Sequence, residues 1–407
     1  MSELHRREFL QAGALAGTAA TAVNLGSSSP VRGDEKDASK LTLPTRKLGK
    51  TGVDVTLLNH GTWQAPGAME RLLRFSYANG VRYYDTANVY GTEPGLARWF
   101  AAMPEVRKNI FLVTKDSPNT ADQMMAMLDQ RLATLQVDHV DLFFVHALGS
   151  HIRGQAAVDF ARSPAYARAI EAIKKSGKAR FVGFSTHAPN KAEIIQAAAE
   201  GGFVDAIMVA YTPWLDKDEP INRALDAAHA KGIGLISMKQ VAGADGARLL
   251  AEVPKHVPSL KDKGLSPYQG LLHAIWTDER IATSCVSMKN LDQIAENTKA
   301  ARNFVPLRVA ELRGLRDAFL AAGPTMCAHC DGRCAAAAGT DANLGDLARF
   351  LTYHEQHGHR REAREYYAAL DARERDWAGA DLLAAQAACP NHLDFAAILP
   401  RADAKLA

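Results

Sequence analysis

The 407-residue sequence lacks several features, and each absence excludes a class of protein. No apolar run reaches the ~20 residues that a helix needs to cross a bilayer, so no stable membrane span is expected in the mature chain. The sequence also lacks a large excess of either charge, since 48 Lys and Arg against 45 Asp and Glu leave a formal net charge of +3. That balance argues against nucleic acid as the main partner.

A glycine-rich Gly-x-Gly-x-x-Gly turn after an early strand is absent too, which counts against a doubly wound dinucleotide-binding sheet. Instead, short apolar runs alternate with longer amphipathic segments between about residues 44 and 300. Eight runs are expected to form strands: TLLNHG, RYYDTA, IFLVTK, VDLFFVH, ARFVGFS, DAIMVAY, GLISMK and IATSCVS. Buried parallel strands separated by helices, in this number and length, predict an α/β fold, the (β/α)8 TIM barrel.

Segments at both ends extend this barrel. The stretch RKLGKTGVDVTLLNHGTW predicts an N-terminal β-hairpin that closes the bottom of the barrel. Beyond residue 302 the strand signal disappears, and helical patterns predict a small all-α module that contains four of the five cysteines. We therefore expect three parts: residues 1–40, a barrel at 41–302 and a helical module at 303–407.

The N-terminus resembles a twin-arginine export signal. HRREFLQAGALAGTAATAV places Arg6 and Arg7 before an Ala- and Gly-rich apolar region, and Ala20-Thr21-Ala22 offers a cleavage site. The alternative is a basic tail. The resemblance implies that the twin-arginine machinery exports the folded chain to the periplasm, where the signal is either removed or kept as a membrane tether.

Polar residues gather at the ends of three neighbouring strands, where the chemistry of a TIM barrel occurs. Asp85 ends the second strand and Tyr90 lies in its loop, while Lys115 and His146 end the next two strands. A buried carboxylate needs a positive partner, and we expect Lys115 to provide it. The same ammonium is expected to lower the pKa of Tyr90, which then protonates a carbonyl oxygen that His146 orients.

These residues give the sequence its resemblance to the aldo-keto reductases. LGKTGVDVTLLNHGTW, GVRYYDTANVYG, FLVTK, DLFFVHAL and GKARFVGFS match that family's pattern. The resemblance implies a catalytic tetrad of Asp85, Tyr90, Lys115 and His146, with Tyr90 as general acid, a carbonyl substrate, and NADP or NAD as cofactor. Trp63 is expected to line the substrate pocket.

The resemblance also implies a set of cofactor contacts near the later strand ends. Asn290 is an N-cap candidate for the helix after the last strand, and a helix N-terminus favours phosphate. Met208, Met238 and Gln293 depart from residues common in the family, which leaves NADP against NAD open. The expected contacts are Thr62, Ser185, Met208, Met238, Ser287, Lys289, Asn290, Gln293, Glu296 and Asn297.

The C-terminal cysteines suggest a metal site. CAHCDGRC gives Cys327, Cys330 and Cys334, and Cys389 precedes a proline. Soft thiolates at such spacing suit an iron–sulfur cluster or zinc, and an exported protein could instead form two disulfides. The pattern resembles a reductase subgroup fused to an iron–sulfur-type segment, which implies one [4Fe–4S] cluster.

The remaining cysteine and a group of histidines are interpreted more simply. Cys285, within the last strand, is expected to fill the apolar core. His354, His357 and His359 are expected on a solvated helical face.

The expected function is hydride transfer between a nicotinamide cofactor and an aldehyde, ketone or sugar-like carbonyl. One alternative is an exported binding or redox-relay module on the same scaffold, without nicotinamide turnover. Another is imine chemistry at Lys115 or Lys239, because both lysines end strands.

Overall fold

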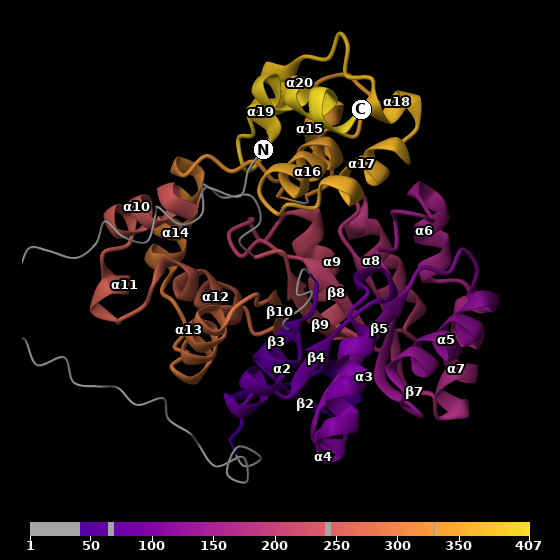
Figure 1. The fold of residues 1–407 in the computed structure, drawn as a ribbon. Helices are drawn as coiled ribbons and strands as arrows, with labels where there is room; N and C mark the ends of the chain where they lie inside the picture. The colour runs from indigo at the N-terminus through magenta and orange to yellow at the C-terminus, as the bar shows by residue number, and fades with distance from the viewer. Residues whose placement is uncertain (1–40, 64–68, 241–245, 329) are drawn as a thin grey trace, which may run out of the picture. The chain divides into compact units, whose positions relative to one another are not determined.

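The computed structural model describes residues 41–407 except 64–68, 241–245 and 329 (Figure 1). The predicted export signal lies outside these described residues. The barrel and the C-terminal helices belong to one compact unit, Glu35–Ala407.

Eight parallel strands form a closed barrel, as the apolar runs predict. Each strand pairs with its neighbours in chain order, and the last strand, β10, closes the ring against the first, β3. Most of the strand residues are buried, which explains why the runs read as continuous apolar stretches. The strands are β3 (Leu58–Gly61), β4 (Tyr83–Asp85), β5 (Phe111–Asp116), β6 (Val140–Val145), β7 (Ala179–Thr186), β8 (Ala206–Ala210), β9 (Gly234–Met238) and β10 (Ile281–Ser287).

Helices surround the barrel and begin and end at recognisable residues. α7 begins after Ser163, whose hydroxyl accepts the Tyr166 N–H, and ends before Gly177 at φ +76°. The surrounding helices are α2 (Met69–Ala78), α3 (Glu93–Ala102), α4 (Pro104–Asn109), α5 (Met124–Leu135), α6 (Gly154–Ala161), α7 (Pro164–Ser176), α8 (Lys191–Gly201), α9 (Pro220–Ala230), α10 (Gly246–His256), α11 (Ser259–Asp262), α12 (Pro267–Thr277) and α13 (Leu291–Arg302).

The predicted hairpin is present as β1 (Thr45–Lys47) and β2 (Asp54–Thr56), paired antiparallel. Leu48 and Val55 are buried in the interior cluster of the barrel, with Tyr83 and Phe111 from the first residues of β4 and β5. The hairpin therefore closes the N-terminal end of the barrel and leaves the opposite end for the site.

The C-terminal helices form two separate apolar cores. α14 (Val309–Ala321) packs with α10 and α12, through residues such as Leu249 and Phe319. The predicted boundary at residue 302 thus falls before a helix that shares its core with barrel helices. We call residues 333–406 the C-terminal module: α15 (Arg333–Ala337), α16 (Leu344–Glu355), α17 (Arg360–Ala368), α18 (Ala372–Arg375), α19 (Leu382–Ala388) and α20 (Phe395–Leu406).

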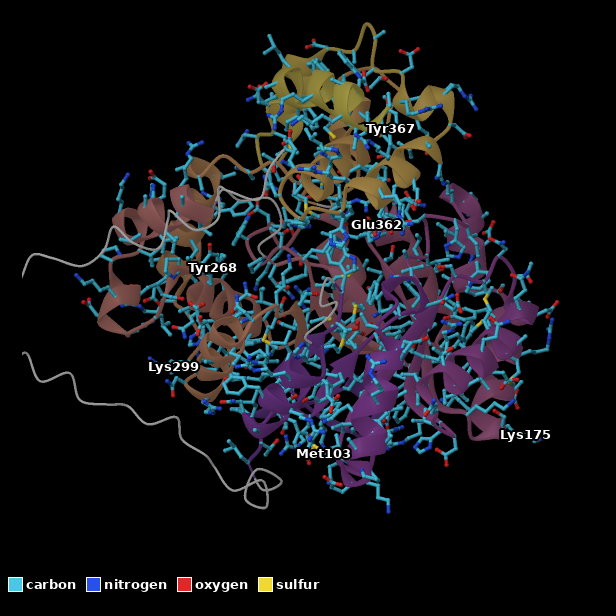
Figure 2. All side chains as sticks on the ribbon, in the orientation of Figure 1. Met103, Lys175, Tyr268, Lys299, Glu362 and Tyr367 are labelled. Atoms are coloured by element: carbon cyan, nitrogen blue, oxygen red, sulfur yellow. The ribbon has the colours of Figure 1, made fainter. Side chains whose placement is uncertain are left out.

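Side chains of the module pack around their own core, which includes Leu347 and Leu399. Tyr367 on α17 illustrates how its helices are joined, because its hydroxyl donates to Asp403 of α20 at 2.8 Å (Figure 2). Among the described helices, none has the length and apolar character needed to cross a membrane.

Candidate active site at the mouth of the barrel

The four tetrad residues converge at the carboxyl ends of β4, β5 and β6. Asp85 ends β4, Lys115 is near the end of β5, Tyr90 ends a short 3-10 turn (Asn88–Tyr90), and His146 directly follows β6. Adjacent parallel strands bring these ends together. The structure thus places the four predicted residues at one site.

Asp85 and Lys115 form a buried ion pair. Their side chains are 2% and 1% exposed, and the Lys115 ammonium donates to Asp85 Oδ1. It also donates to the Thr86 carbonyl at 2.9 Å. This ion pair agrees with the expectation that the Lys115 ammonium offsets the energetic cost of burying the Asp85 carboxylate.

Tyr90 lies against His146 rather than against the Lys115 ammonium. Its hydroxyl is 3.5 Å from His146 Nε2, and the two rings meet edge to face at 5.6 Å. Lys115 Nζ lies 5.2 Å from the centre of the Tyr90 ring. Burial, with the nearby Asp85 carboxylate, raises the pKa of Tyr90 well above its ordinary value. The prediction that Lys115 acidifies Tyr90 is therefore wrong for this structure: the phenol stays protonated.

His146 is also held neutral. Burial, the Lys115 ammonium, His151 and Lys239 lower the pKa of its imidazole well below the ordinary value. The site therefore presents a neutral phenol and a neutral imidazole, both of which can hydrogen-bond a carbonyl oxygen.

Cys285 packs against the apolar interior cluster of the barrel, as expected, and it also lines the cavity of this site. Burial, together with the nearby Asp85 carboxylate, raises the pKa of its thiol. A Cβ on Gly61 would approach Cys285 Sγ to 2.9 Å, so the glycine makes room for the sulfur. The strand pattern predicts the apolar packing of Cys285 but not its place beside the tetrad.

A cavity of about 1150 Å³ opens above the tetrad and continues to the start of α13. Ser185 is fixed there, because its hydroxyl accepts the Ala147 N–H at 2.9 Å. Most of the predicted cofactor contacts line this cavity: Ser185, Met208, Met238, Ser287, Lys289, Gln293, Glu296 and Asn297.

Two predicted cofactor residues do not line the cavity. Thr62 is fully buried, and its hydroxyl shares a 2.7 Å hydrogen bond with Thr92. Asn290 is the N-cap of α13, where its side chain accepts the Gln293 N–H at 2.9 Å. The structure supports structural roles for both residues.

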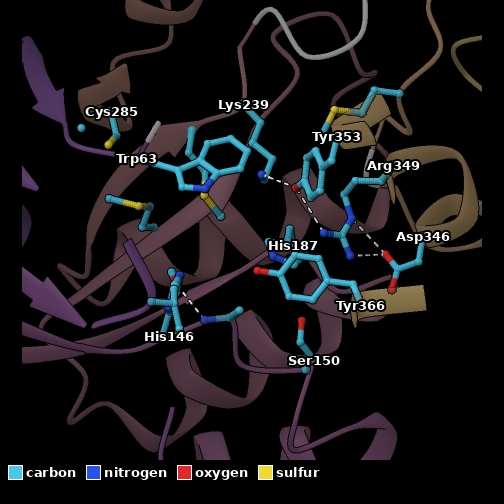
Figure 3. Close-up of a pocket in the computed structure, with 18 of the residues that line it drawn as sticks. Trp63, His146, Ser150, His187, Lys239, Cys285, Asp346, Arg349, Tyr353 and Tyr366 are labelled. Carbon is cyan, nitrogen blue, oxygen red and sulfur yellow. Dashed lines mark hydrogen bonds and ion pairs between the residues drawn. The ribbon is translucent and has the colours of Figure 1, made fainter. Parts of the chain in front are cut away.

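The C-terminal module completes the cavity. Trp63, as predicted, lines it, and its ring packs at 5.4 Å against Tyr353 and at 5.0 Å against His359. His357 lines the cavity as well, so the expectation of a solvated histidine face is wrong for His357 and His359. Figure 3 shows Lys239, Tyr353 and Arg349 joined by hydrogen bonds on this side of the cavity.

Sequence reasoning missed Tyr353, Arg349 and Tyr366, all of which line the cavity. A signal was present, because Phe350, Tyr353 and His357 recur at the three- and four-residue spacing of one helix face. The spacing alone does not show that this face covers the barrel.

The cysteines Cys327, Cys330, Cys334 and Cys389 line a second cavity of about 250 Å³. Burial, with Cys389 and Cys330 nearby, raises the pKa of the Cys334 thiol to about 12. Cys330, Cys334 and Cys389 form no disulfide in the structure, which disagrees with the alternative of two disulfides. Within the described residues, no three His, Cys, Asp or Glu side chains are grouped so that they could hold a metal ion. The structure therefore gives the predicted metal site no direct support.

Comparison with known proteins identifies the barrel. Residues 57–317 match the Aldo/keto reductase family. The chain belongs to this family. The match covers the barrel strands and more than half of the chain. By its membership of this family, this aldo/keto reductase is an oxidoreductase that acts on carbonyl compounds.

Curated relatives of this aldo/keto reductase are about a quarter identical to it over the aligned residues. L-glyceraldehyde 3-phosphate reductase of Escherichia coli O157:H7 is 24% identical over 320 residues, which cover 63% of this chain and 87% of that protein. D-galacturonate reductase of Hypocrea jecorina is 27% identical over 240 residues, covering 54% and 75%.

Solved structures support the fold alone. The holo form of aldo-keto reductase AKR11C1 from Bacillus halodurans has a TM-score of 0.53 at 20% identity, covering 68% of this chain and 96% of that one.

Proposed function

We propose that this aldo/keto reductase transfers hydride from NADPH or NADH to an aldehyde, ketone or sugar-like carbonyl. The observation that carries the proposal is the convergence of Tyr90 and His146, both neutral, on the floor of one large cavity above a buried Lys115–Asp85 pair. The relatives named for reductions of glyceraldehyde 3-phosphate and galacturonate support a hydroxylated carbonyl substrate.

The residues lining the cavity fit a dinucleotide. At about 1150 Å³ the cavity exceeds what a small carbonyl compound alone would fill. The cofactor, when bound, supplies the hydride. Ser185 would hold its carboxamide end, and Lys289, Glu296 and Asn297 would hold the distal end. The Gln293 side chain is uncharged, and its Oε1 accepts the Lys289 N–H at 2.8 Å. It therefore supplies no positive charge that would favour NADP over NAD.

In reduction, the protonated Tyr90 hydroxyl donates to the carbonyl oxygen and gives up its proton as that oxygen gains negative charge. His146 Nε2, close to the same hydroxyl, orients the oxygen. The Lys115 ammonium neutralises the Asp85 carboxylate and, through its bond to the Thr86 carbonyl, holds the strand ends beneath the site in place. Lys115 is committed to this ion pair and Lys239 to Tyr353, so neither lysine is arranged for imine formation.

Replacing Tyr90 with Phe tests this function. We expect kcat/KM for NADPH-dependent reduction of glyceraldehyde to fall about 100-fold or more, because the proton donor is lost. Tyr366→Phe, which removes another cavity phenol, is the matched control and should stay within about threefold of wild type. Equal turnover by wild type and Tyr90→Phe would rule out Tyr90 as the proton donor. Absence of turnover in wild type would favour the alternative, a binding or redox-relay module on this scaffold.

We further propose that residues 1–40 direct twin-arginine export to the periplasm. The proposal rests on Arg6, Arg7 and the small-residue stretch that follows. In cell fractionation, Arg6→Lys combined with Arg7→Lys should keep the protein in the cytoplasm. Periplasmic recovery of this double variant would contradict the export route.

We also propose that Cys327, Cys330, Cys334 and Cys389 hold one [4Fe–4S] cluster. The position of all four cysteines around one cavity supports this proposal. A cluster also accepts thiolates that are too far apart to bind one shared ion. Anaerobically purified protein should contain about four iron and four sulfide per chain. Cys334→Ala should lose both, while Cys285→Ala, outside this cavity, should keep them. Protein that binds no iron in either form would refute the cluster.

A further inference from the structure

A second contact between a lysine and a tyrosine lies in the same cavity, on the side of the C-terminal module (Figure 3). Lys239 Nζ donates to the Tyr353 hydroxyl at 2.5 Å. Arg349 Nη1 donates to the same oxygen at 3.2 Å. Arg349 is in turn held by Asp346 at 2.6 Å. The phenol oxygen is therefore bound by two cations from two parts of the chain.

The backbone and the aromatic neighbours direct Lys239 to this position. Lys239 directly follows β9 with φ +64°, a left-handed conformation that residues with a side chain rarely adopt outside functional sites. Its ammonium lies 4.9 Å from the centre of the Trp63 ring and 4.8 Å from that of Tyr353. These contacts hold the ammonium between the two rings as well as on the hydroxyl.

The charges around Tyr353 differ from those around Tyr90. Lys239 and Arg349 lower the pKa of Tyr353 although the residue is buried, whereas burial raises the pKa of Tyr90. The other titratable groups facing Tyr353 are Asp346, paired with Arg349, His357, which stacks at 5.6 Å, and Tyr366 at 6.4 Å. Burial, together with Lys239 and Lys289, lowers the pKa of His357 to about 4, so it stays neutral. One cavity therefore contains a phenol that keeps its proton and a phenol whose anion is stabilised.

We propose that Tyr353 is a general base that removes a proton from the carbon next to a carbonyl group held by Tyr90 and His146. The C–H bond breaks, an O–H bond forms on Tyr353, and the electron pair moves toward the carbonyl oxygen to give an enolate. Tyr90 and His146 hydrogen-bond the oxygen as it becomes negative, and the reverse step returns the proton.

Enolisation requires neutral donors at the oxygen and a base for the adjacent carbon. Tyr90, His146 and Tyr353 supply these groups around one cavity. The activity would be enolisation of α-hydroxy carbonyl compounds, and it consumes no oxidant or reductant. It rests on the carbonyl site proposed above but not on hydride transfer. The C-terminal module would thus contribute a catalytic residue, with Lys239 and Arg349 as its positioning residues.

Deuterium exchange without nicotinamide tests the proposal. Full-length protein is incubated in D₂O with hydroxyacetone or glyceraldehyde, and incorporation at the carbon next to the carbonyl is followed by NMR. Wild-type protein should incorporate deuterium faster than buffer alone does. Tyr353→Phe should do so about 100-fold more slowly than wild type. Tyr367→Phe, on the same module but outside the cavity lining, is the matched control and should exchange like wild type. Lys239→Met should shift the pH profile of exchange to higher pH, and Lys239→Arg should restore it in part.

A second measurement covers the case in which Tyr353→Phe is destabilised. In the near-ultraviolet titration of tyrosinate, wild type should show a phenol that ionises before the others, and Lys239→Met should remove that first step. Absence of wild-type exchange with both probes, equal exchange in Tyr353→Phe, or no early tyrosinate step would overturn the proposal. Because NADPH-dependent reduction is measured separately with Tyr90→Phe, a failed reductase function and a failed enolisation are distinguishable.

Discussion

At the scale of residues, burial and neighbouring charges decide how the groups of the tetrad ionise. Asp85, Lys115 and His146 lie together because parallel strands end at one rim of a barrel. The pKa of Tyr90 could not be predicted, because it depends on burial and on groups distant in the chain, such as Cys285 and Tyr353. The position of a side chain follows from local pattern, whereas its ionisation follows from tertiary packing.

The buried ion pair makes a prediction about stability. Lys115→Met leaves Asp85, 2% exposed, without its cation and should cost about 3–5 kcal/mol in the free energy of unfolding by urea. Lys47→Met breaks the pair of Lys47 with Asp54, whose side chains are 69% and 58% exposed, and should cost at most about 1 kcal/mol. Similar costs for the two variants would contradict the account of the pair.

The neutral His146 makes a prediction about pH. An exposed imidazole titrates near ~6.5, but the lowered pKa of His146 keeps it neutral above that pH and for some distance below it. We therefore expect no break near pH 6.5 in the profile of kcat/KM for carbonyl reduction. A break there that disappears in His146→Gln would show that the imidazole titrates normally.

At the scale of elements, the apolar runs were sufficient for the barrel, because its strands are buried and short. α20 was not predicted, although Phe395, Ile398, Leu399 and Ala402 follow helical spacing. Pro400 lies inside this helix, and a proline in a helix interior ordinarily argues against one. The packing of α20 against α16 outweighs that local cost.

Glu311 joins α11 to α14 and makes a second prediction about pH. Lys263, Arg308 and Ser259 bind its carboxylate and lower its pKa from 4.5 to about 2. A lowered pKa stabilises the folded chain above the unfolded value near 4.5, and this contribution is lost as pH falls toward 2. Glu311→Gln should therefore lower the urea midpoint at pH 7, and its difference from wild type should shrink below pH 4. A difference that does not depend on pH would contradict this role.

At the scale of the whole molecule, the cavity is built by parts that are far apart in the sequence. Trp63, Lys239 and Tyr353 meet at one point, although they come from a loop after β3, the end of β9 and α16. Contacts of this kind depend on how the C-terminal module docks on the barrel, which periodicity cannot show. The second half of the site was for this reason beyond reach of sequence reasoning.

Two ion pairs join the module to the barrel and predict its local stability. Arg153 contacts Glu374, and Arg333 contacts Glu219. Arg153→Ala combined with Glu219→Gln should speed amide hydrogen exchange in α16 by about tenfold and leave β4–β6 unchanged. Arg162→Ala, which removes exposed pairs within the barrel, should leave α16 as in wild type. Exchange that rises equally in the barrel strands would show that these pairs stabilise the whole chain instead.

Hydride transfer at the Tyr90 site is the central claim, and isotopic labelling tests it most directly. Wild-type protein is given glyceraldehyde and NADPH that carries deuterium at the transferable position of the nicotinamide, and the alcohol product is examined by mass spectrometry and NMR. The account predicts one deuterium on the former carbonyl carbon, formed at least about 100-fold more slowly by Tyr90→Phe. An alcohol that lacks the label, or no alcohol with either NADPH or NADH across a panel of aldehydes, ketones and sugars, would contradict it.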